Sequence, residues 1–104
     1  MYRMYVDDIR NPKGKFDVIV RSSEEAIEYI VRNGCPSFIS FDHDLGGDDT
    51  SMNVVRFIVD LDLDSDDGFI PYNFNYFVHS ANPVGKANIE GYLNSYLKHR
   101  KDNS

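Results

Sequence analysis

The chain has 104 residues, 41% of them hydrophobic, and a formal net charge of −6. This length predicts a single domain whose core needs no disulfide or structural metal, and the single cysteine, Cys35, excludes an internal disulfide. The charge disfavours non-specific binding to nucleic acid or to an anionic membrane, and no apolar run reaches the roughly 20 residues that a membrane helix needs.

The first third of the chain predicts two strands and a helix. MYRMYVDDIR lacks the apolar region of a signal peptide, so we expect a cytoplasmic protein, and residues 1–6 predict a strand. The turn residues of NPKGK separate this strand from DVIVR, a β-branched run that predicts a second strand over 17–21. Ser22 and Glu25 have the spacing of a capping box, and Gly34 is placed to end the helix that follows.

The rest of the chain predicts two more strands, each followed by a helix. Ser37–Phe41 predicts the third strand, and apolar residues at helical spacing come after it. DLDLDSDDG, Asp60–Gly68, lacks the glycine and the glutamate of a calcium loop and predicts a solvated acidic loop. NFNYFVH, residues 73–79, predicts the fourth strand, and Asn82 followed by Pro83 predicts the start of the last helix.

This order of elements predicts an open α/β sheet. Alternation of strands and helices after residue 17 favours right-handed crossovers and a parallel sheet that is covered by helices. We expect four mainly parallel strands in the order 2-1-3-4 and about three helices, in one domain over 1–104 with a frayed tail at 99–104. The connection between the first two strands is too short for a crossover helix.

Three of the predicted strands end in polar residues: Asp7-Asp8, Asp42-His43-Asp44 and His79-Ser80. Each cluster alone is also what a polar loop after a strand looks like. In the order 2-1-3-4, however, the three ends meet at the edge where open parallel sheets bind ligands. Carboxylates at this edge repel one another and recruit a cation, and oxygen ligands suit Mg²⁺, so we expect a site for Mg²⁺ or Mn²⁺ there.

The segment HSANPVGKAN predicts a phosphate site beside the carboxylates. Backbone N–H groups at the start of a helix bind phosphate, and Gly85 permits a close approach, although a plain capped turn has the same spacing. The other candidate phosphate or substrate ligands are Ser80, Asn82, Lys86, Asn88 and Arg10. His43 and His79 follow neighbouring strands and are the expected pair for proton transfer.

YVDDIRNP, SFDHDLGGD and VHSANPVGKANI, spread over residues 2–97, resemble the cyclic-phosphate-processing receiver domains. The chain is more distantly similar to response-regulator receivers, and Asp7-Asp8, Asp42 and Ser80 match their acidic pair, phosphoacceptor and hydroxyl residue. The resemblance implies a truncated receiver/flavodoxin-like fold and adds Asp44 as a metal ligand. Compared with a receiver, the first crossover helix is reduced to a loop and the fifth strand with its lysine is missing. A phosphoaspartate switch would need Lys86 as a substitute.

The sequence is compatible with three functions. The first is metal-dependent hydrolysis of a cyclic phosphate on a nucleotide or an RNA end, in which Mg²⁺ or Mn²⁺ is the cofactor and His43 and His79 serve as acid and base. The second is a catalytically inert receiver-like module that binds a small phosphorylated ligand. The third is a truncated receiver that is phosphorylated on Asp42.

Overall fold

Four parallel strands form one sheet in the predicted order β2-β1-β3-β4. The computed structural model describes residues 1–103. The strands are β1 (Arg3–Val6), β2 (Val18–Val20), β3 (Phe38–Phe41) and β4 (Asn75–Val78). All three strand pairs are parallel, including β1 with β2.

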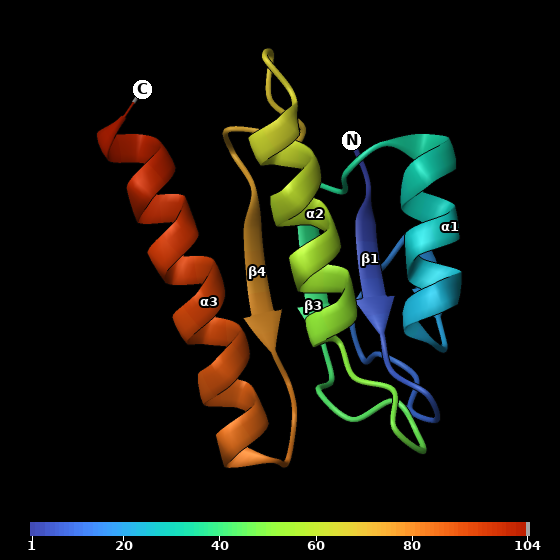
Figure 1. The fold of residues 1–104 in the computed structure, drawn as a ribbon. Helices are drawn as coiled ribbons and strands as arrows, with labels where there is room; N and C mark the ends of the chain where they lie inside the picture. Colours follow the sequence, from blue (N-terminus) through green and yellow to red (C-terminus); the bar gives the residue numbers. More distant parts are fainter. Residues whose placement is uncertain (104) are drawn as a thin grey trace.

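Three helices lie side by side on one face of this sheet (Figure 1). They are α1 (Ser23–Asn33), α2 (Met52–Asp64) and α3 (Pro83–Asp102). The chain moves in the same direction across the sheet from β2 to β3 and from β3 to β4, so right-handed crossovers place α1 and α2 on the same side. The expectation of a sheet covered by helices is therefore correct for one face only. None of the helices in the described part of the chain is long and apolar enough to cross a membrane.

The predicted caps begin two of these helices. The Ser22 side chain accepts a hydrogen bond from the Glu25 N–H at 3.1 Å, although the Glu25 carboxylate accepts from the Arg21 N–H at 3.3 Å in place of the Ser22 N–H. Asn82 caps α3 by accepting from the Gly85 N–H at 3.0 Å, and Pro83 is the first helical residue.

Strand alternation divides the sheet residues between the two faces. Six helix-facing positions are fully or almost fully buried, namely Met4, Val6, Val20, Ile39, Phe41 and Val78, and Val18 and Tyr76 on the same face are partly buried. The alternate positions form the other face, which we call the open face: Arg3, Tyr5, Ile19, Phe38, Ser40, Asn75 and Phe77. The Phe16 ring, from the loop before β2, packs on Tyr5 at 5.2 Å and covers part of the open face.

A loop replaces the missing first crossover helix. The guanidinium of Arg21 donates to the carbonyl oxygens of Asp7 at 3.0 Å and Arg10 at 2.5 Å, and to the Asn11 side chain. The partly exposed guanidinium of Arg21 thus holds the backbone of this loop in place. The loop carries two of the candidate metal ligands, Asp7 and Asp8.

The acidic run after α2 differs from its prediction at Asp62. This residue belongs to α2, is 6% exposed, and accepts hydrogen bonds from the Tyr96 hydroxyl and from the N–H groups of Phe69 and Ile70. The Arg100 guanidinium lies 3.4 Å from Asp62 and donates to the Ile70 carbonyl at 2.8 Å. The tail that was expected to fray instead continues α3 as far as Asp102, and Ser104 lies outside the described residues.

Asp62→Ala is expected to lower the free energy of unfolding by roughly 2–4 kcal/mol, because two backbone donors and the Arg100 charge lose their acceptor. These hydrogen bonds and Arg100 hold the pKa of Asp62 below its ordinary range, although burial alone raises it. The stabilisation by Asp62 is therefore present above the unfolded pKa, about 3.9, and is lost as the pH falls. The free energy of unfolding of the variant should therefore depend less on pH in acid than that of wild type. Asp60→Ala, an exposed neighbour on α2, is the control for chemical denaturation. Equal stability losses in the two variants would contradict this role.

Candidate functional site

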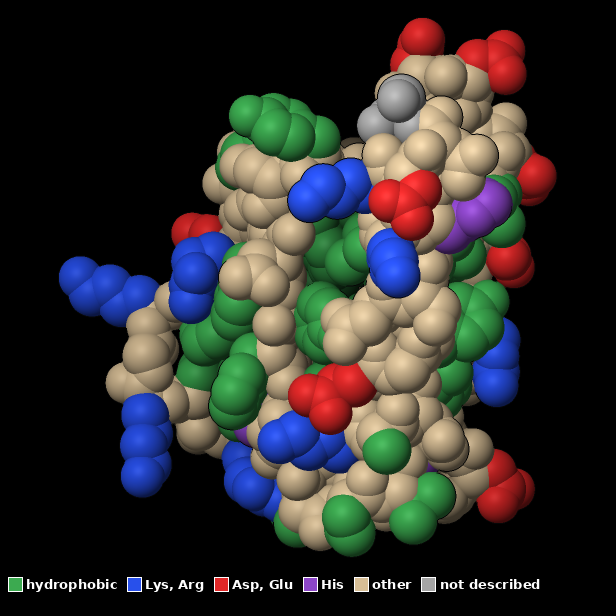
Figure 2. Space-filling view, turned by 90° about the vertical axis from the view of Figure 1, so that its left-hand side faces the viewer, with side chains coloured by type: hydrophobic (Ala, Val, Ile, Leu, Met, Phe, Trp, Pro, Cys, Tyr) green, Lys and Arg blue, Asp and Glu red, His purple; other side chains and the backbone are tan. Residues whose placement is uncertain are grey.

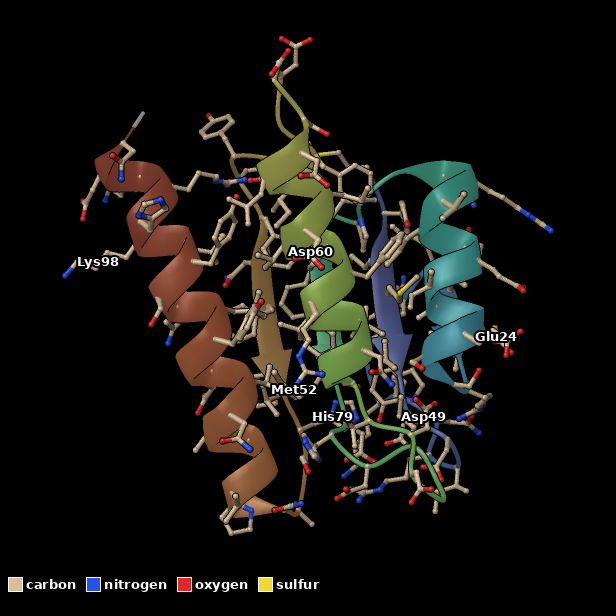
Figure 3. The ribbon with its side chains drawn as sticks, viewed as in Figure 1. Glu24, Asp49, Met52, Asp60, His79 and Lys98 are labelled. Carbon is tan, nitrogen blue, oxygen red and sulfur yellow. The ribbon has the colours of Figure 1, made fainter. Side chains whose placement is uncertain are left out.

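The three polar strand ends meet at one edge of the sheet, as predicted. Backbone hydrogen bonds continue past the last strand residues, from Asp7 N–H to Val20 (3.1 Å), from Asp42 N–H to Val6 (2.8 Å) and from His79 N–H to Phe41 (2.8 Å). Figure 3 shows His79 at the end of the molecule toward which the strands point.

Three carboxylates converge at this edge. One oxygen from each of Asp7, Asp8 and Asp42 lies within 4.8 Å of the other two. Asp7 is fully buried and Asp42 is 7% exposed, whereas Asp8 is partly exposed. Gly46, at φ 93°, lies so close to Asp8 that a Cβ would stand 3.5 Å from the carboxylate. The loop after β3 therefore approaches the cluster at Asp8.

The Asp7 carboxylate is fixed by neighbours on both sides. Its Oδ1 accepts from the N–H groups of Ile9 at 3.0 Å and Arg10 at 2.8 Å, and its Oδ2 lies 3.0 Å from His79 Nε2. Burial alone raises the pKa of Asp7, but the two backbone hydrogen bonds and His79 outweigh it and lower the pKa below its usual value. Asp7 therefore carries a firm negative charge in a buried position.

Asp42 behaves in the opposite way. Burial, followed by the charge of Asp7, raises the pKa of Asp42, although a hydrogen bond from the Ser80 hydroxyl opposes the shift. The main chain at Asp42 is held by Ser51, which is fully buried and donates its hydroxyl to the Asp42 carbonyl. The cluster thus concentrates more negative charge than its own neighbours neutralise.

His79 shares the open face with the carboxylates. Its Nε2 contacts Asp7, its Nδ1 lies 2.8 Å from the Ser40 hydroxyl, and its ring stacks on Tyr5 at 4.5 Å with an interplanar angle of 3°. Position and orientation of the imidazole are therefore set by three contacts with neighbouring strands.

His43 lies on the opposite side of the sheet. It follows Asp42 by one residue, and its ring packs against Gly85 at the start of α3, on the helix-covered face. Its Nδ1 lies 3.1 Å from Asp44. The expectation that His43 and His79 act as one pair for proton transfer is wrong, because the two rings lie on different faces of the sheet.

The start of α3 differs from the predicted phosphate site. Gly85 was expected to let a phosphate approach, but the His43 ring occupies that space. Two of the donors there are also engaged, because the Gly85 N–H donates to the Asn82 side chain and the Lys86 N–H donates to the Asn82 carbonyl, and Pro83 has no N–H. The Asn82 amide also donates to Asp44 at 3.1 Å. Protein groups therefore occupy much of the space at the N-terminus of α3.

Gly85→Ala is expected to lower the free energy of unfolding by about 1–3 kcal/mol, because the added Cβ would stand 2.3 Å from His43 Cγ and overpack the site. Gly91→Ala is the matched control on the same helix. Nothing lies within 4 Å of a Cβ at Gly91, and the change should stabilise by roughly 0.5–1 kcal/mol. Denaturant unfolding of both variants checks the prediction, and a Gly85→Ala protein as stable as Gly91→Ala would contradict it.

The remaining candidates occupy different positions. Asp44 directs its side chain to His43 and Asn82, hydrogen bonds that lower its pKa, and it is not part of the carboxylate cluster. The Arg10 guanidinium is half-exposed, with Nε 3.8 Å from Asp7, so it borders the cluster. Lys86 is partly buried on the first turn of α3, and Asn88 is exposed on the next turn.

Four residues of this site were not among the sequence candidates: Tyr5, Arg21, Ser40 and Ser51. Ser40 offered a signal, because it is a lone polar residue within an apolar strand and buried hydroxyls need partners. Tyr5 is two residues before Asp7 on β1, so alternation places both on one face. Arg21 and Ser51 gave no signal, since their partners are main-chain atoms of distant loops.

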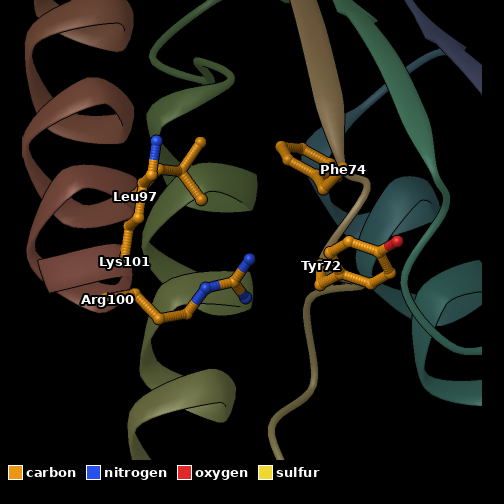
Figure 4. Close-up of a pocket in the computed structure, with 5 residues that line it drawn as sticks. All are labelled: Tyr72, Phe74, Leu97, Arg100 and Lys101. Atoms are coloured by element: carbon orange, nitrogen blue, oxygen red, sulfur yellow. The ribbon is translucent and has the colours of Figure 1, made fainter. Parts of the chain in front are cut away.

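The candidate site lies at the open edge of the sheet, and a pocket elsewhere on the molecule is not part of it. A pocket of about 440 Å³ is lined by Tyr72, Phe74, Leu97, Arg100 and Lys101 (Figure 4). Its aromatic residues precede β4, so this pocket lies at the opposite end of the sheet from the carboxylates. Arg100 there is already bound to Asp62.

Comparison with known protein families assigns most of the chain to one described family. The family described as Cyclic-phosphate processing Receiver domain matches residues 2–95. No curated protein and no solved structure matches the chain. The matched range contains every residue of the carboxylate cluster, together with His43 and His79.

Proposed function

Because the chain belongs to the cyclic-phosphate processing receiver domain family, we propose that it hydrolyses a cyclic phosphate with a divalent cation held by Asp7, Asp8 and Asp42. The convergence of these three carboxylates carries the proposal. A nucleotide or an RNA end is the substrate that we expect.

The residues present suit a hard cation. Oxygen is the donor that Mg²⁺ and Mn²⁺ prefer, and Mg²⁺ commonly takes one or two carboxylates while it keeps several waters. Two of the three carboxylates are almost fully buried, and their repulsion is relieved only partly by Arg10 and His79. The family resemblance adds the main-chain carbonyl of Asp44 as a further ligand.

Hydrolysis of a cyclic phosphate requires water to add to phosphorus, one ring P–O bond to break, and a proton to reach the leaving oxygen. A bound Mg²⁺ or Mn²⁺ supplies charge neutralisation at the phosphoryl oxygens. Arg10 is exposed enough to hold a phosphate oxygen beside the cluster, and Ser80 keeps Asp42 oriented.

Proton transfer is assigned to His79 and not to the pair predicted from sequence. His79 lies on the open face beside Asp7, and its stacking on Tyr5 and contact with Ser40 fix its ring. His43 packs against α3 on the other face, so we assign it to the packing of the loop after β3.

Phosphorus NMR of nucleoside 2′,3′- and 3′,5′-cyclic phosphates tests the proposal. We expect conversion to a phosphomonoester with Mg²⁺ or Mn²⁺ and no conversion with EDTA. Binding without conversion would favour an inert module, and labelling of Asp42 by a small phosphodonor without conversion would favour a phosphoacceptor.

A further inference from the structure

One large aromatic side chain on the open face remains exposed next to the site. Phe77 on β4 is 56% exposed. It precedes His79 by two residues, so strand alternation directs both side chains to the open face. Figure 2 views the molecule from the side of α3 and β4 and shows hydrophobic side chains at the surface there.

The strand register arranges the open face in rows. Ile19, Tyr5, Ser40 and Phe77 are paired in one row across the sheet. The next row toward the strand ends contains Asp7, Asp42 and His79. Strands rise about 3.3 Å per residue, so neighbouring rows on one face are about 6.6 Å apart. Neighbouring strands lie about 4.8 Å apart, so Asp42 and Phe77 stand about 8 Å apart on the diagonal, a distance that a nucleotide can span between its phosphate and its base.

The two central residues in the row of Phe77, Tyr5 and Ser40, carry hydroxyl groups and are buried. Ser40 is 5% exposed and bound to His79, and Tyr5 is covered by the His79 and Phe16 rings. Phe77 is thus an exposed aromatic ring beside the site with polar neighbours, including the exposed amide of Asn75 on the preceding row, while the exposed side chains of Ile9 and Ile19 are aliphatic. An exposed aromatic ring with polar neighbours suits the binding of one flat ring that carries polar atoms at its edge, such as a nucleobase, better than the binding of a broad apolar protein surface.

We propose that Phe77 is the platform on which the base of the substrate nucleotide stacks while its cyclic phosphate lies at the Asp7, Asp8 and Asp42 cluster. The inference rests on the proposed function and adds the feature that makes a nucleoside the preferred carrier of the phosphate. Every base has a face that stacks on an aromatic ring, so the platform selects nucleotides without selecting a particular base. The net charge of −6 argues against contacts with a long nucleic acid and favours a single nucleotide or a strand end.

The test compares turnover of a nucleoside 2′,3′-cyclic phosphate with turnover of methyl riboside 2′,3′-cyclic phosphate, which has no base. Wild type should prefer the nucleotide in kcat/KM by roughly 5- to 100-fold, the range that base–aromatic stacking supports. Phe77→Leu keeps an apolar side chain but should lose this preference through a higher KM, and Phe77→Tyr should keep it. Tyr72→Leu, which changes an exposed ring at the far end of the sheet, should match wild type.

The outcomes separate this inference from the function on which it rests. Equal turnover of the two substrates by wild type, or an unchanged preference in Phe77→Leu, would overturn the base platform and leave the hydrolysis intact. Absence of turnover on both substrates with Mg²⁺ and Mn²⁺ would overturn the proposed function and the platform together.

Discussion

Asp42→Asn is expected to abolish the stabilisation of the protein by Mg²⁺ or Mn²⁺ and to reduce cyclic-phosphate turnover below detection. A cation that binds only the folded state stabilises wild type by about 1.4 kcal/mol at ten times its Kd, which raises Tm by roughly 5–10 °C for a domain of this size. Without the Asp42 charge, the remaining ligands are Asp7 and Asp8. The metal-free variant should nevertheless be more stable than wild type, because a neutral amide relieves the repulsion by Asp7 and the cost of burying a charge.

Asp48→Asn is the matched control, since it makes the same change of charge at an exposed position in the same loop. Thermal unfolding with EDTA and across a magnesium titration, together with turnover, measures both variants. If both respond to Mg²⁺ as wild type does, the cluster is not the cation site.

His79→Ala is expected to lower turnover by roughly 10²–10⁴-fold, the usual contribution of a group that transfers a proton. The ring also holds Asp7 and Ser40, so the loss of activity alone does not distinguish proton transfer from positioning. His79→Gln retains hydrogen-bonding groups but transfers no proton at neutral pH, and it should be as inactive as His79→Ala. Recovery of activity in His79→Gln would show that the residue only positions Asp7.

His43→Ala is the comparison for His79→Ala. We expect it to lower the unfolding midpoint, because its ring fills the space above Gly85, while turnover of the folded protein stays close to wild type. A loss of turnover in His43→Ala as large as in His79→Ala would restore the histidine pair that the sequence suggested.

Strand order and the carboxylate cluster could be predicted because both depend on local signals. The strands are short apolar runs that end abruptly in charge, as at Asp7 and Asp42, and the order 2-1-3-4 brings those ends together. The cap at Asn82 is equally local, because it needs only the polar side chain and the proline after it.

The positions of the histidines required more than strand order. The strand register aligns His79 with Asp42, and no local pattern fixes this register. Since His43 follows Asp42 by one residue, alternation places its side chain on the other face. Gly85 had the signature of a phosphate turn, yet its missing side chain accommodates a ring from a loop far away in the sequence. The burial of Asp62 could not be predicted from the acidic run around it, because its partner Arg100 lies 38 residues later in the chain.

Mn²⁺-induced line broadening in the amide NMR spectrum tests the central claim most directly, because it locates the cation without requiring a substrate. If the carboxylate cluster holds the cation, substoichiometric Mn²⁺ first broadens the signals of Asp7, Asp8 and Asp42 and leaves those of Tyr72 and Arg100 sharp, and excess Mg²⁺ reverses the effect. Broadening centred on the acidic run Asp60–Gly68, or no selective broadening in the chain, would contradict this claim.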